Sequence, residues 1–408
     1  MPMRALVVCP DAPPDASTSA GGMRRLSLFL AAIRGIAEEI EMLFLVPEAY
    51  IRDTPDLDAL SRQQSRFWNA RIRVALAPLA RRREGYLNHY VQGAFSVRNH
   101  PFFHAYTGAA ATQAVATCLS RRPDFVFVQR LAAMVPILRQ ADLGMKLFFD
   151  LDDVEHKARL RAAWRQPRWP ARYAYAAQSP AIHLAERQAA RRSRAVFVCS
   201  EPDRRYLAKL GVPRLHVVPN AVALPEKIYR KVEARSVLFL GFFGHAPNVA
   251  AAERLIRHIW PRVRARAPDA TLLIAGAQVE ALASFSAPPE GVRMLGFVAD
   301  LATLYVQSRV ICCPILQGGG TRVKIIEAGA YGRPVVSTTI GAEGLDFRDG
   351  AEILLADSDH DIAEACVALL HDEARCRALG TAIQDKVHAG YDPEAISTRI
   401  AAIIERNL

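Results

Sequence analysis

The chain has 408 residues, of which 51% are hydrophobic and 8% aromatic, and its formal net charge is +11. This length exceeds what one hydrophobic core usually supports, so we expect two domains of about 200 residues each. The composition excludes a disordered chain. We expect no membrane-spanning helix, because no stretch reaches about 18 uninterrupted apolar residues. We also expect no secretory signal, because the first apolar run is short and leads directly into prolines.

The positive charge suits nucleic acid, an anionic membrane surface or anionic substrates. It is spread along the chain, which argues against a nucleic-acid partner. One segment, RLRAAWRQPRWPARYAY at 159–175, interleaves five arginines with tryptophans and tyrosines. Such a mixture suits a membrane headgroup region or a polyanionic or lipid-linked acceptor. It is equally typical of an arginine-rich loop packed on its own domain.

In the first half of the chain, short apolar runs alternate with longer amphipathic ones, as in parallel βαβ units. The pattern predicts strands at 5–10, 41–46, 124–129, 146–150 and 195–200. It predicts helices at about 22–36, 107–120 and 180–192. The stretch from 47 to 105 is poorly patterned.

The same rhythm restarts after a proline-interrupted joint at about 219–234. Strands are predicted at 236–241, 270–276, 292–296, 309–314 and 334–338, and helices at about 248–266, after Thr321 and at 393–407. The predicted fold class is therefore α/β, with two doubly wound Rossmann-like sheets. We assign residues 1–220 to the first domain, 221–233 to a linker and 234–390 to the second domain.

Seven cysteines occur without a C-x-x-C pair, and several of them end apolar runs. They are typical of buried, reduced thiols, and they predict a cytoplasmic protein. The seven are Cys9, Cys118, Cys199, Cys312, Cys313, Cys366 and Cys376.

The segment QGGGTRVKIIEAG at 317–329 combines three glycines with two cations at a predicted helix start. Positive side chains in a first helical turn oppose the helix dipole unless an anion lies in front of them. Glycines let backbone N–H groups approach a phosphate closely. We therefore predict that Gly318, Gly319, Gly320, Thr321, Arg322 and Lys324 bind a diphosphate. Glu327, three residues after Lys324, could accept hydrogen bonds from a ribose diol.

Two open α/β sheets in tandem place ligands at the carboxyl ends of their strands, and we expect them in the cleft between the domains. Gly21 and Gly22 follow the first predicted strand at a helix start, and they form a second candidate for phosphate or sugar approach.

The segment DLDDVEHK follows the strand at 146–150. Asp152 with Glu155 resembles a capping box, which favours a structural role for Asp152. Asp150, Asp153 and His156 are candidates for contact with an acceptor or a sugar, although a lone histidine is as often structural. The D-x-D pattern also occurs in metal-dependent enzymes. We predict no metal, because Arg322, Lys324 and the helix dipole can offset the diphosphate charge.

Both halves of the sequence resemble retaining glycosyltransferases of the GT-B fold, family 4. The resemblance covers the segments SAGGMRR, FDLDDVEHKARLR, VFVCSEPDRRYLAKLGVPRLHVVPNAV, LFLGFFGHAPNVAAAERLIRHIWP and CCPILQGGGTRVKIIEAGAYGRPVVSTTIGAEGL. It implies that Glu327 holds the donor ribose and that the glycine loop with Lys324 holds the diphosphate. It also implies that Phe297 and Val298 lie at the nucleotide base, that Glu343 lies near the donor, and that a C-terminal helix at about 391–408 crosses back onto the first domain.

Two positions depart from the family pattern. The family pattern has two glutamates separated by seven residues, and the first would fall at Gly319. The loop GFFGHAPN after the first strand of the second domain lacks the family's Arg and Lys. Arg322 is a candidate to supply the missing charge.

The resemblance implies transfer of a sugar, with retention, from a nucleotide diphosphate sugar to an acceptor hydroxyl, in polysaccharide or glycolipid synthesis. No cofactor is expected beyond this donor as co-substrate. Arg322 and Lys324 would stabilise the departing diphosphate, and Asp153 would orient a substrate or assist as a base. The expected partners are the donor, a glycan or lipid-linked acceptor and the cytoplasmic face of a membrane. A sugar-nucleotide epimerase and a non-catalytic nucleotide-sugar binder remain alternatives.

Overall fold

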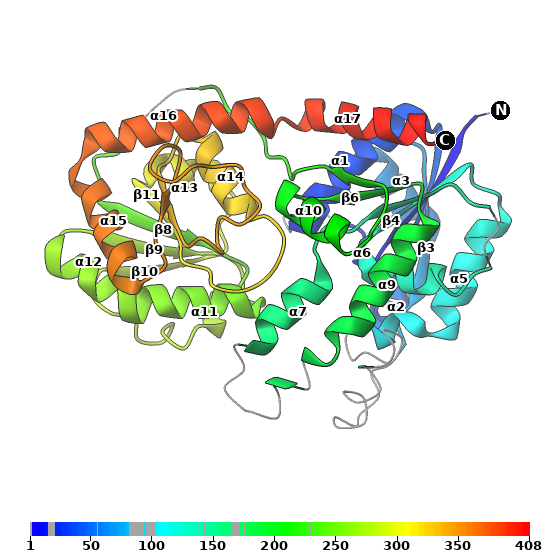
Figure 1. Ribbon diagram of the computed structural model, residues 1–408, viewed down its shortest axis with the longest axis horizontal. Helices are drawn as coiled ribbons and strands as arrows, with labels where there is room; N and C mark the ends of the chain where they lie inside the picture. Colours follow the sequence, from blue (N-terminus) through cyan, green and yellow to red (C-terminus); the bar gives the residue numbers. More distant parts are fainter. Residues whose placement is uncertain are drawn as a thin grey trace. The chain divides into compact units, whose positions relative to one another are not determined.

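The computed structural model describes residues 2–14, 21–54, 56–80, 94, 103–141, 144–164, 172–173, 176–227 and 231–408. The chain divides into two compact units. Unit 1 consists of Met1–Asn220 with Glu394–Leu408, and unit 2 consists of Ala221–Pro393. Each unit contains one parallel β-sheet covered by helices on both faces (Figure 1). The predicted fold class of two doubly wound sheets is thus confirmed.

The sheet of unit 1 has seven parallel strands in the order β3-β2-β1-β4-β5-β6-β7. The central strands are buried on both faces, which explains their continuous apolar sequences. The strands are β1 (Arg4–Cys9), β2 (Glu39–Val46), β3 (Ile72–Pro78), β4 (Phe125–Gln129), β5 (Leu147–Asp150), β6 (Ala195–Val198) and β7 (Leu215–Val217). The strand order reverses between β1 and β4.

The helices of unit 1 include several that the sequence pattern did not predict. They are α1 (Gly21–Ile36), α2 (Glu48–Arg52), α3 (Leu57–Trp68), α5 (Ala109–Ser120), α6 (Arg130–Ile137), α7 (Glu155–Trp164), α9 (Ser179–Arg192), α10 (Glu201–Lys209) and α17 (Pro393–Arg406), with a 3₁₀ turn η2 (His104–Thr107). Helix α17 joins unit 1 next to β7, where Arg399 donates a hydrogen bond to the Val217 carbonyl at 2.9 Å.

The sheet of unit 2 has six parallel strands in the order β10-β9-β8-β11-β12-β13, and the order reverses between β8 and β11. The strands are β8 (Ser236–Leu240), β9 (Thr271–Ala275), β10 (Val292–Gly296), β11 (Val310–Cys313), β12 (Val335–Ser337) and β13 (Leu354–Leu355). The helices are α11 (Ala246–Arg254), α12 (Trp260–Arg266), α13 (Leu301–Gln307), α14 (Val323–Ala330), α15 (Asp359–His371) and α16 (Glu373–Gly390), with a π-helical turn η3 (Leu255–Ile259) between α11 and α12 and a 3₁₀ turn η4 (Val279–Ala281).

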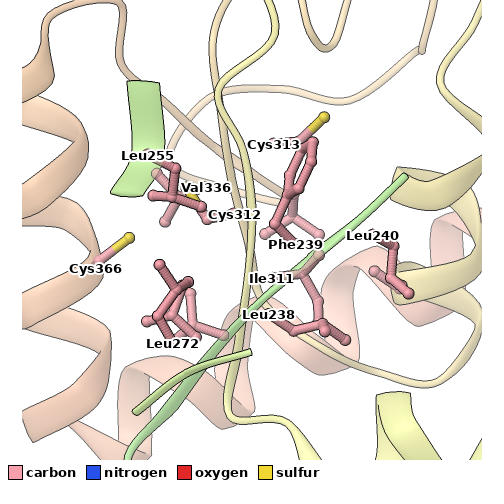
Figure 2. Packing of buried hydrophobic residues seen from close by; sticks show 14 of the residues in the cluster. Leu238, Phe239, Leu240, Leu255, Leu272, Ile311, Cys312, Cys313, Val336 and Cys366 are labelled. Atoms are coloured by element: carbon pink, nitrogen blue, oxygen red, sulfur yellow. The ribbon is translucent and has the colours of Figure 1, made fainter. Parts of the chain in front are cut away.

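The core of unit 2 is built by the strands and by the helices that pack on them. Figure 2 shows Leu238 and Phe239 of β8, Ile311 and Cys312 of β11 and Cys366 of α15 in this core. All seven cysteines of the chain are buried and unpaired, as expected from their sequence context. Within the described residues, every helix is too short or too polar to cross a lipid bilayer.

Candidate functional site

In unit 2, the predicted diphosphate loop lies at the point where the strand order reverses. The loop leaves β11 after Cys313 and enters α14 at Val323, next to the end of β8. In open α/β sheets, ligands bind outside the carboxyl ends of the strands at such a switch point. The fold therefore presents this loop at the position that most favours a ligand.

Glycine is required at two positions of this loop by the backbone itself. Gly318 has φ of 101° and Gly320 has φ of 64°, a region that residues with a side chain rarely adopt. The Arg322 guanidinium folds back over the loop and donates hydrogen bonds to the carbonyls of Gly319, Gly320 and Gln317. Arg322 thereby fixes the loop conformation.

Helix α14 begins one residue later than expected, so Arg322 is its N-cap residue and only Lys324 lies in the first turn. The Arg322 side chain cannot accept a hydrogen bond from a backbone N–H group, because a guanidinium has only donors. The first turn also contains no acidic residue that could do so. No side chain therefore caps the N–H groups at the start of α14, and one of them, that of Ile325, donates to the Arg322 carbonyl at 2.9 Å.

The Lys324 ammonium is held close to the end of β8. It donates hydrogen bonds to the Leu240 carbonyl and to Asn248 Oδ1, the latter at 3.0 Å, and it lies 4.5 Å from the centre of the Phe239 ring. Burial lowers the pKa of Lys324 to about 8, and Arg322 contributes in the same direction against an opposing effect of Cys313. The site therefore holds a poorly hydrated cation, which an anion would stabilise.

Glu327 is oriented by a tyrosine that the sequence pattern did not identify. The buried Tyr305 hydroxyl of α13 donates to Glu327 Oε2 at 2.9 Å and lies 3.3 Å from the Lys324 carbonyl. The Tyr305 ring stacks on Tyr331 with 5.4 Å between ring centres. Helix α13 thus positions the carboxylate predicted to bind a ribose.

The segment after β8 supplies two further residues that sequence reasoning missed, His245 at the N-cap of α11 and Asn248 in its first turn. Asn248 binds Lys324 through Oδ1 and donates to the Phe242 carbonyl at 2.9 Å. Loss of hydration lowers the pKa of His245, and the charges of Arg322 and Lys324 lower it further. The signal that could have identified these two residues is their polar character in the segment GFFGHAPN, which lacks the family's Arg and Lys.

The remaining donor candidates also follow strands of the same sheet. Phe297 comes directly after β10 and is 58% exposed, while Val298 is half-buried. Glu343 is half-buried in the turn after β12, where Gly344 has φ of 82°. Thr321 is buried in the glycine loop. All four lie in segments that leave the carboxyl edge of this sheet.

In unit 1, Asp150 is buried in an ion pair with Arg25. The guanidinium donates to both carboxylate oxygens, at 2.6–2.9 Å, and neither side chain is exposed. Burial raises the pKa of Asp150 to about 6, although Arg25 lowers it, and Asp152 raises it further. Asp150 therefore ties α1 to β5 and has no exposed surface for the acceptor contact that we predicted from the sequence.

Asp152 takes part in the same network and does not begin a helix. Helix α7 begins at Glu155, and the Asp152 carboxylate pairs with Arg130 at 3.1 Å and with Arg25 at 3.4 Å. Burial raises the pKa of Asp152, but these two cations outweigh that effect and lower it overall. Asp152 is structural, as expected, but through ion pairs rather than through a capping box.

Glu155 is the first residue of α7, and Asp153 lies two residues before it. Both are half-buried, and burial together with the charge of Asp153 raises the pKa of Glu155 to about 8. A carboxyl group with this pKa can exchange a proton near neutral pH. The catalytic role of Asp153 stays a prediction.

His156 is buried, and both of its ring nitrogens have protein partners. Nδ1 contacts Glu186 of α9, and Nε2 lies 2.9 Å from the Tyr206 hydroxyl. A sugar hydroxyl could reach this ring only by displacing Tyr206, so the geometry favours the structural alternative for His156.

In the part of the chain that the structure describes, one group of side chains could hold a metal ion. Ligand atoms of His156, His183 and Glu186 all lie within 4.8 Å of one another, and His183 Nδ1 is buried without a hydrogen-bond partner among the described residues. His156 Nδ1 and the Glu186 carboxylate contact each other directly. This group therefore requires no metal to satisfy its buried carboxylate.

Gly22 has a different local role from the phosphate approach predicted for it. A Cβ atom at Gly22 would lie 1.9 Å from Nη2 of Arg130, so glycine makes room for this guanidinium at the start of α1. Gly21 is the first residue of α1.

Part of the arginine–aromatic segment at 159–175, residues 165–171 and 174–175, lies outside the described residues. Trp164 is exposed, and the centre of its ring lies 6.0 Å from Cζ of Arg172.

Two doubly wound parallel sheets in one chain are typical of the GT-B class of folds, and solved structures confirm this fold. The HepE protein of Anabaena, solved in complex with UDP and glucose, superimposes with a TM-score of 0.68 at 14% identity, over 99% of this chain and 100% of that one. The sucrose-phosphate synthase of Thermosynechococcus elongatus does so with a TM-score of 0.71 at 15% identity, over 99% of this chain and 98% of that one.

Sequence comparison assigns both halves to glycosyltransferase domains. Residues 32–221 match the glycosyl transferase 4-like domain, and residues 234–372 match the glycosyl transferases group 1. The chain is thus composed of glycosyltransferase domains arranged in a GT-B fold.

Two curated relatives are mannosyltransferases. The phosphatidyl-myo-inositol mannosyltransferase of Mycolicibacterium smegmatis is 29% identical over 179 residues, which are 42% of this chain and 45% of the relative. The GDP-mannose-dependent monoacylated alpha-(1-6)-phosphatidylinositol monomannoside mannosyltransferase of Corynebacterium glutamicum is 28% identical over 188 residues, 41% of this chain and 49% of the relative. The aligned stretch spans about half the length of each relative.

Proposed function

We propose that this protein transfers a hexosyl group from a nucleotide diphosphate sugar to an acceptor hydroxyl, with retention at the anomeric carbon. The observation that carries this proposal is the start of α14, where a glycine loop, an uncapped helix end and the Lys324 ammonium converge beside Glu327. The UDP and glucose bound by the HepE protein and the mannose transfer named for the curated relatives support the same class of donor.

The proposed catalysis depends on stabilisation of the leaving group, the nucleoside diphosphate. As the bond between the anomeric carbon and the donor oxygen breaks, negative charge develops on the diphosphate. Backbone N–H groups at the start of α14 and the Lys324 ammonium would stabilise that charge more in the transition state than in the ground state. Glu327, fixed by Tyr305, would bind the ribose hydroxyls. Arg322 would act mainly by holding the glycine loop open.

The acceptor hydroxyl would attack the anomeric carbon on the face that the diphosphate leaves, and its proton would pass to a phosphate oxygen of the donor. Asp153 would orient one of the sugars or assist this proton transfer. No metal is needed, because Lys324 and the helix dipole offset the diphosphate charge. We further propose that the enzyme works in the cytoplasm, in glycolipid or polysaccharide synthesis, and contacts a membrane surface when its acceptor is lipid-linked.

Product analysis with UDP-glucose and GDP-mannose tests this proposal. A transferase releases nucleoside diphosphate from the donor. Without an acceptor this release is slow and yields free sugar by hydrolysis, and with an acceptor it is faster and yields the glycosylated acceptor. An epimerase would yield a new nucleotide sugar without acceptor. Binding of either donor without any conversion, over a panel of glycoside and lipid-linked acceptors, would instead identify a non-catalytic binder and contradict the proposal.

A further inference from the structure

Positive charge is concentrated along one edge of the sheet in unit 1. Strands β1, β4, β5, β6 and β7 are consecutive neighbours and run parallel, so their amino ends lie along the same edge. Ligands of open α/β sheets bind at the opposite, carboxyl edge. A small-molecule site at the carboxyl edge therefore does not account for charge at the amino edge.

The segments that lead into these strands are rich in arginine. They are residues 2–4, 121–124, 139–146, 191–194 and 210–214, and their only acidic residues are Asp124 and Asp142. Cations of these segments form the surface that we call the basic edge, which consists of Arg4, Arg122, Lys146, Arg191, Arg194 and Arg214. All of them are exposed except Lys146, which is half-buried.

Hydrogen bonds hold neighbouring parts of the basic edge together. Nη2 of Arg4 donates to the Arg122 carbonyl at 3.2 Å. Nη1 of Arg214 donates to the Arg191 carbonyl at 3.3 Å. The Lys146 carbonyl accepts from a backbone N–H group of β4 at 2.9 Å, which places this lysine beside the start of that strand. The cations thus form a continuous surface from β1 to β7.

Two of these arginines have backbone conformations that favour glycine. The φ angle is 53° at Arg122 and 55° at Arg214. Arg122 follows the C-cap residue of α5, a position where helices commonly have glycine. An arginine in this conformation costs conformational energy, and such costs recur at functional sites. Backbone preference therefore does not explain why position 122 holds an arginine.

Part of the charge compensates the helices that end at this edge. The carboxyl ends of α5, α6 and α9 each carry about half a negative elementary charge, which nearby cations stabilise. Arg192, for example, donates to the Gln140 carbonyl at 3.1 Å, just beyond the end of α6. These partial charges and Asp124 do not balance the full charges of the basic edge. The exposed Glu38 and Glu39 at the start of β2 bound it on one side.

The residue types at the basic edge suit a solvated acidic chain better than a lipid bilayer. The segments that form it contain no aromatic residue, whereas bilayer surfaces favour Trp and Tyr and single-stranded nucleic acids favour stacking rings. Guanidinium groups pair with carboxylates in a planar, two-point geometry. Adjacent strands lie about 4.8 Å apart, so the edge from β1 to β7 spans about 19 Å. An extended peptide of about six residues covers that length.

We propose that the basic edge is a docking surface for an acidic segment of a partner protein, an extended run of aspartate and glutamate residues. Carboxylates of this segment pair with exposed guanidinium groups such as those of Arg122 and Arg194. Runs of like charge commonly serve as interaction tails. The surface is independent of the donor residues and of the proposed function, and a partner bound there leaves the carboxyl edge of the sheet open.

Fluorescence anisotropy of a labelled decaglutamate peptide, titrated with the full chain at about 25 mM NaCl, tests the proposal. We expect saturable binding that weakens as the salt concentration rises, because salt screens exposed charges. Arg122→Gly and Arg194→Ser should each weaken binding about two- to fivefold, and the double variant more. Arg122→Gly should not lower the melting temperature, because glycine suits a φ of 53°, so loss of binding in this variant is separated from unfolding.

The matched controls are Arg52→Ser in α2 and Arg205→Ser in α10, which remove the same charge from exposed positions of unit 1. A single-stranded DNA of ten nucleotides and phosphatidylglycerol vesicles are titrated on the same samples. The proposal is overturned if the peptide does not bind, or if the controls weaken its binding as much as the edge variants do. It is also overturned if the DNA or the vesicles bind the wild type at least tenfold more tightly than the peptide.

Discussion

The hydroxyl of Tyr305 in α13 donates a hydrogen bond to the Glu327 carboxylate in α14. These two helices are separated in the sequence by β11 and the glycine loop. The bond is 2.9 Å long, and the tyrosine ring is buried and stacked on Tyr331. The carboxylate proposed to bind the donor ribose is therefore oriented before the donor arrives, and preorganisation of this kind strengthens binding.

Removal of this hydroxyl should weaken donor binding without unfolding the protein. We expect Tyr305→Phe to lower the affinity for the nucleotide about three- to tenfold and to cost about 1 kcal/mol of stability, because one buried hydrogen bond is lost. Isothermal titration with UDP and GDP checks the affinity, and urea unfolding checks the stability. Tyr391→Phe removes a hydroxyl that accepts from the Asp346 N–H in the same unit and should leave nucleotide affinity unchanged. Equal losses of affinity in both variants would contradict the role of Tyr305.

Nucleotide binding should depend on pH through Lys324. Its pKa of about 8, against 10.5 for an ordinary lysine, means that the ammonium loses its proton as the pH rises through 8. We therefore expect affinity for a nucleoside diphosphate to fall between about pH 8 and pH 10 in the wild type. In Lys324→Arg, which keeps its charge throughout, this fall should disappear. A pH profile that is identical in the two proteins would rule out this cation.

The same lysine should reduce the stability of the ligand-free protein. Between about pH 8 and 10.5 the unfolded chain binds more protons than the folded one, so wild-type stability rises with pH in this window. Below pH 8, burial of the charged Lys324 ammonium lowers the free energy of unfolding by its full amount. We expect Lys324→Met to be about 1 kcal/mol more stable than wild type at pH 7 and to lose this advantage toward pH 10. Urea unfolding at both pH values measures the difference, and a Met variant that is less stable at pH 7 would contradict it.

Removal of one partner from the buried pair of Arg25 and Asp150 should strongly destabilise unit 1. Arg25→Met leaves a buried carboxylate without its cation, and we expect a loss of about 3 to 5 kcal/mol. Arg25→Met combined with Asp150→Leu should recover most of that loss, because neither charge then remains unpaired. Chemical denaturation of the two single variants and the double variant measures the coupling. Additive losses would show that the pair does not interact as described.

Chelation should leave donor binding unchanged. Lys324 and the start of α14 supply the positive charge that a divalent ion provides in metal-dependent enzymes, so EDTA should not alter the affinity for UDP or GDP. The direct contact between His156 and Glu186 likewise needs no ion. Loss of binding after chelation, restored by Mg²⁺ or Mn²⁺, would contradict a donor site that works without a metal ion.

Much of the sheet architecture could be predicted because the central strands are buried on both faces and appear as uninterrupted apolar runs, such as SVLFLG before the GFFGHAPN loop. Strand β3 was missed because it alternates, with Ile72 and Val74 buried and Arg73 exposed, inside a polar stretch. Strand β7 has three residues, all of them half-buried. Elements of this length carry too little pattern to be recognised.

The site could be predicted only in part, for a related reason. The glycines, Lys324 and Glu327 lie in one short segment, so their spacing is visible in the sequence. Tyr305 reaches Glu327 only because α13 packs beside α14. Arg130 reaches Gly22 from the end of β4, the strand that pairs with β1, although the two residues are 108 positions apart in the chain. Contacts of this kind depend on the tertiary fold and leave no local spacing to detect.

The most direct test of the proposed donor site is calorimetric titration of UDP, GDP, UDP-glucose and GDP-mannose into the wild type, Lys324→Ala and Glu327→Gln, with Lys227→Ala and Glu364→Gln as controls. The control residues are exposed and take part in surface ion pairs of the same unit. We predict that at least one of the four ligands binds the wild type and both controls equally, and that its affinity falls about tenfold or more in Lys324→Ala and in Glu327→Gln. Unchanged affinity in these two variants, with the protein folded, would contradict the assignment of the start of α14 as the donor site.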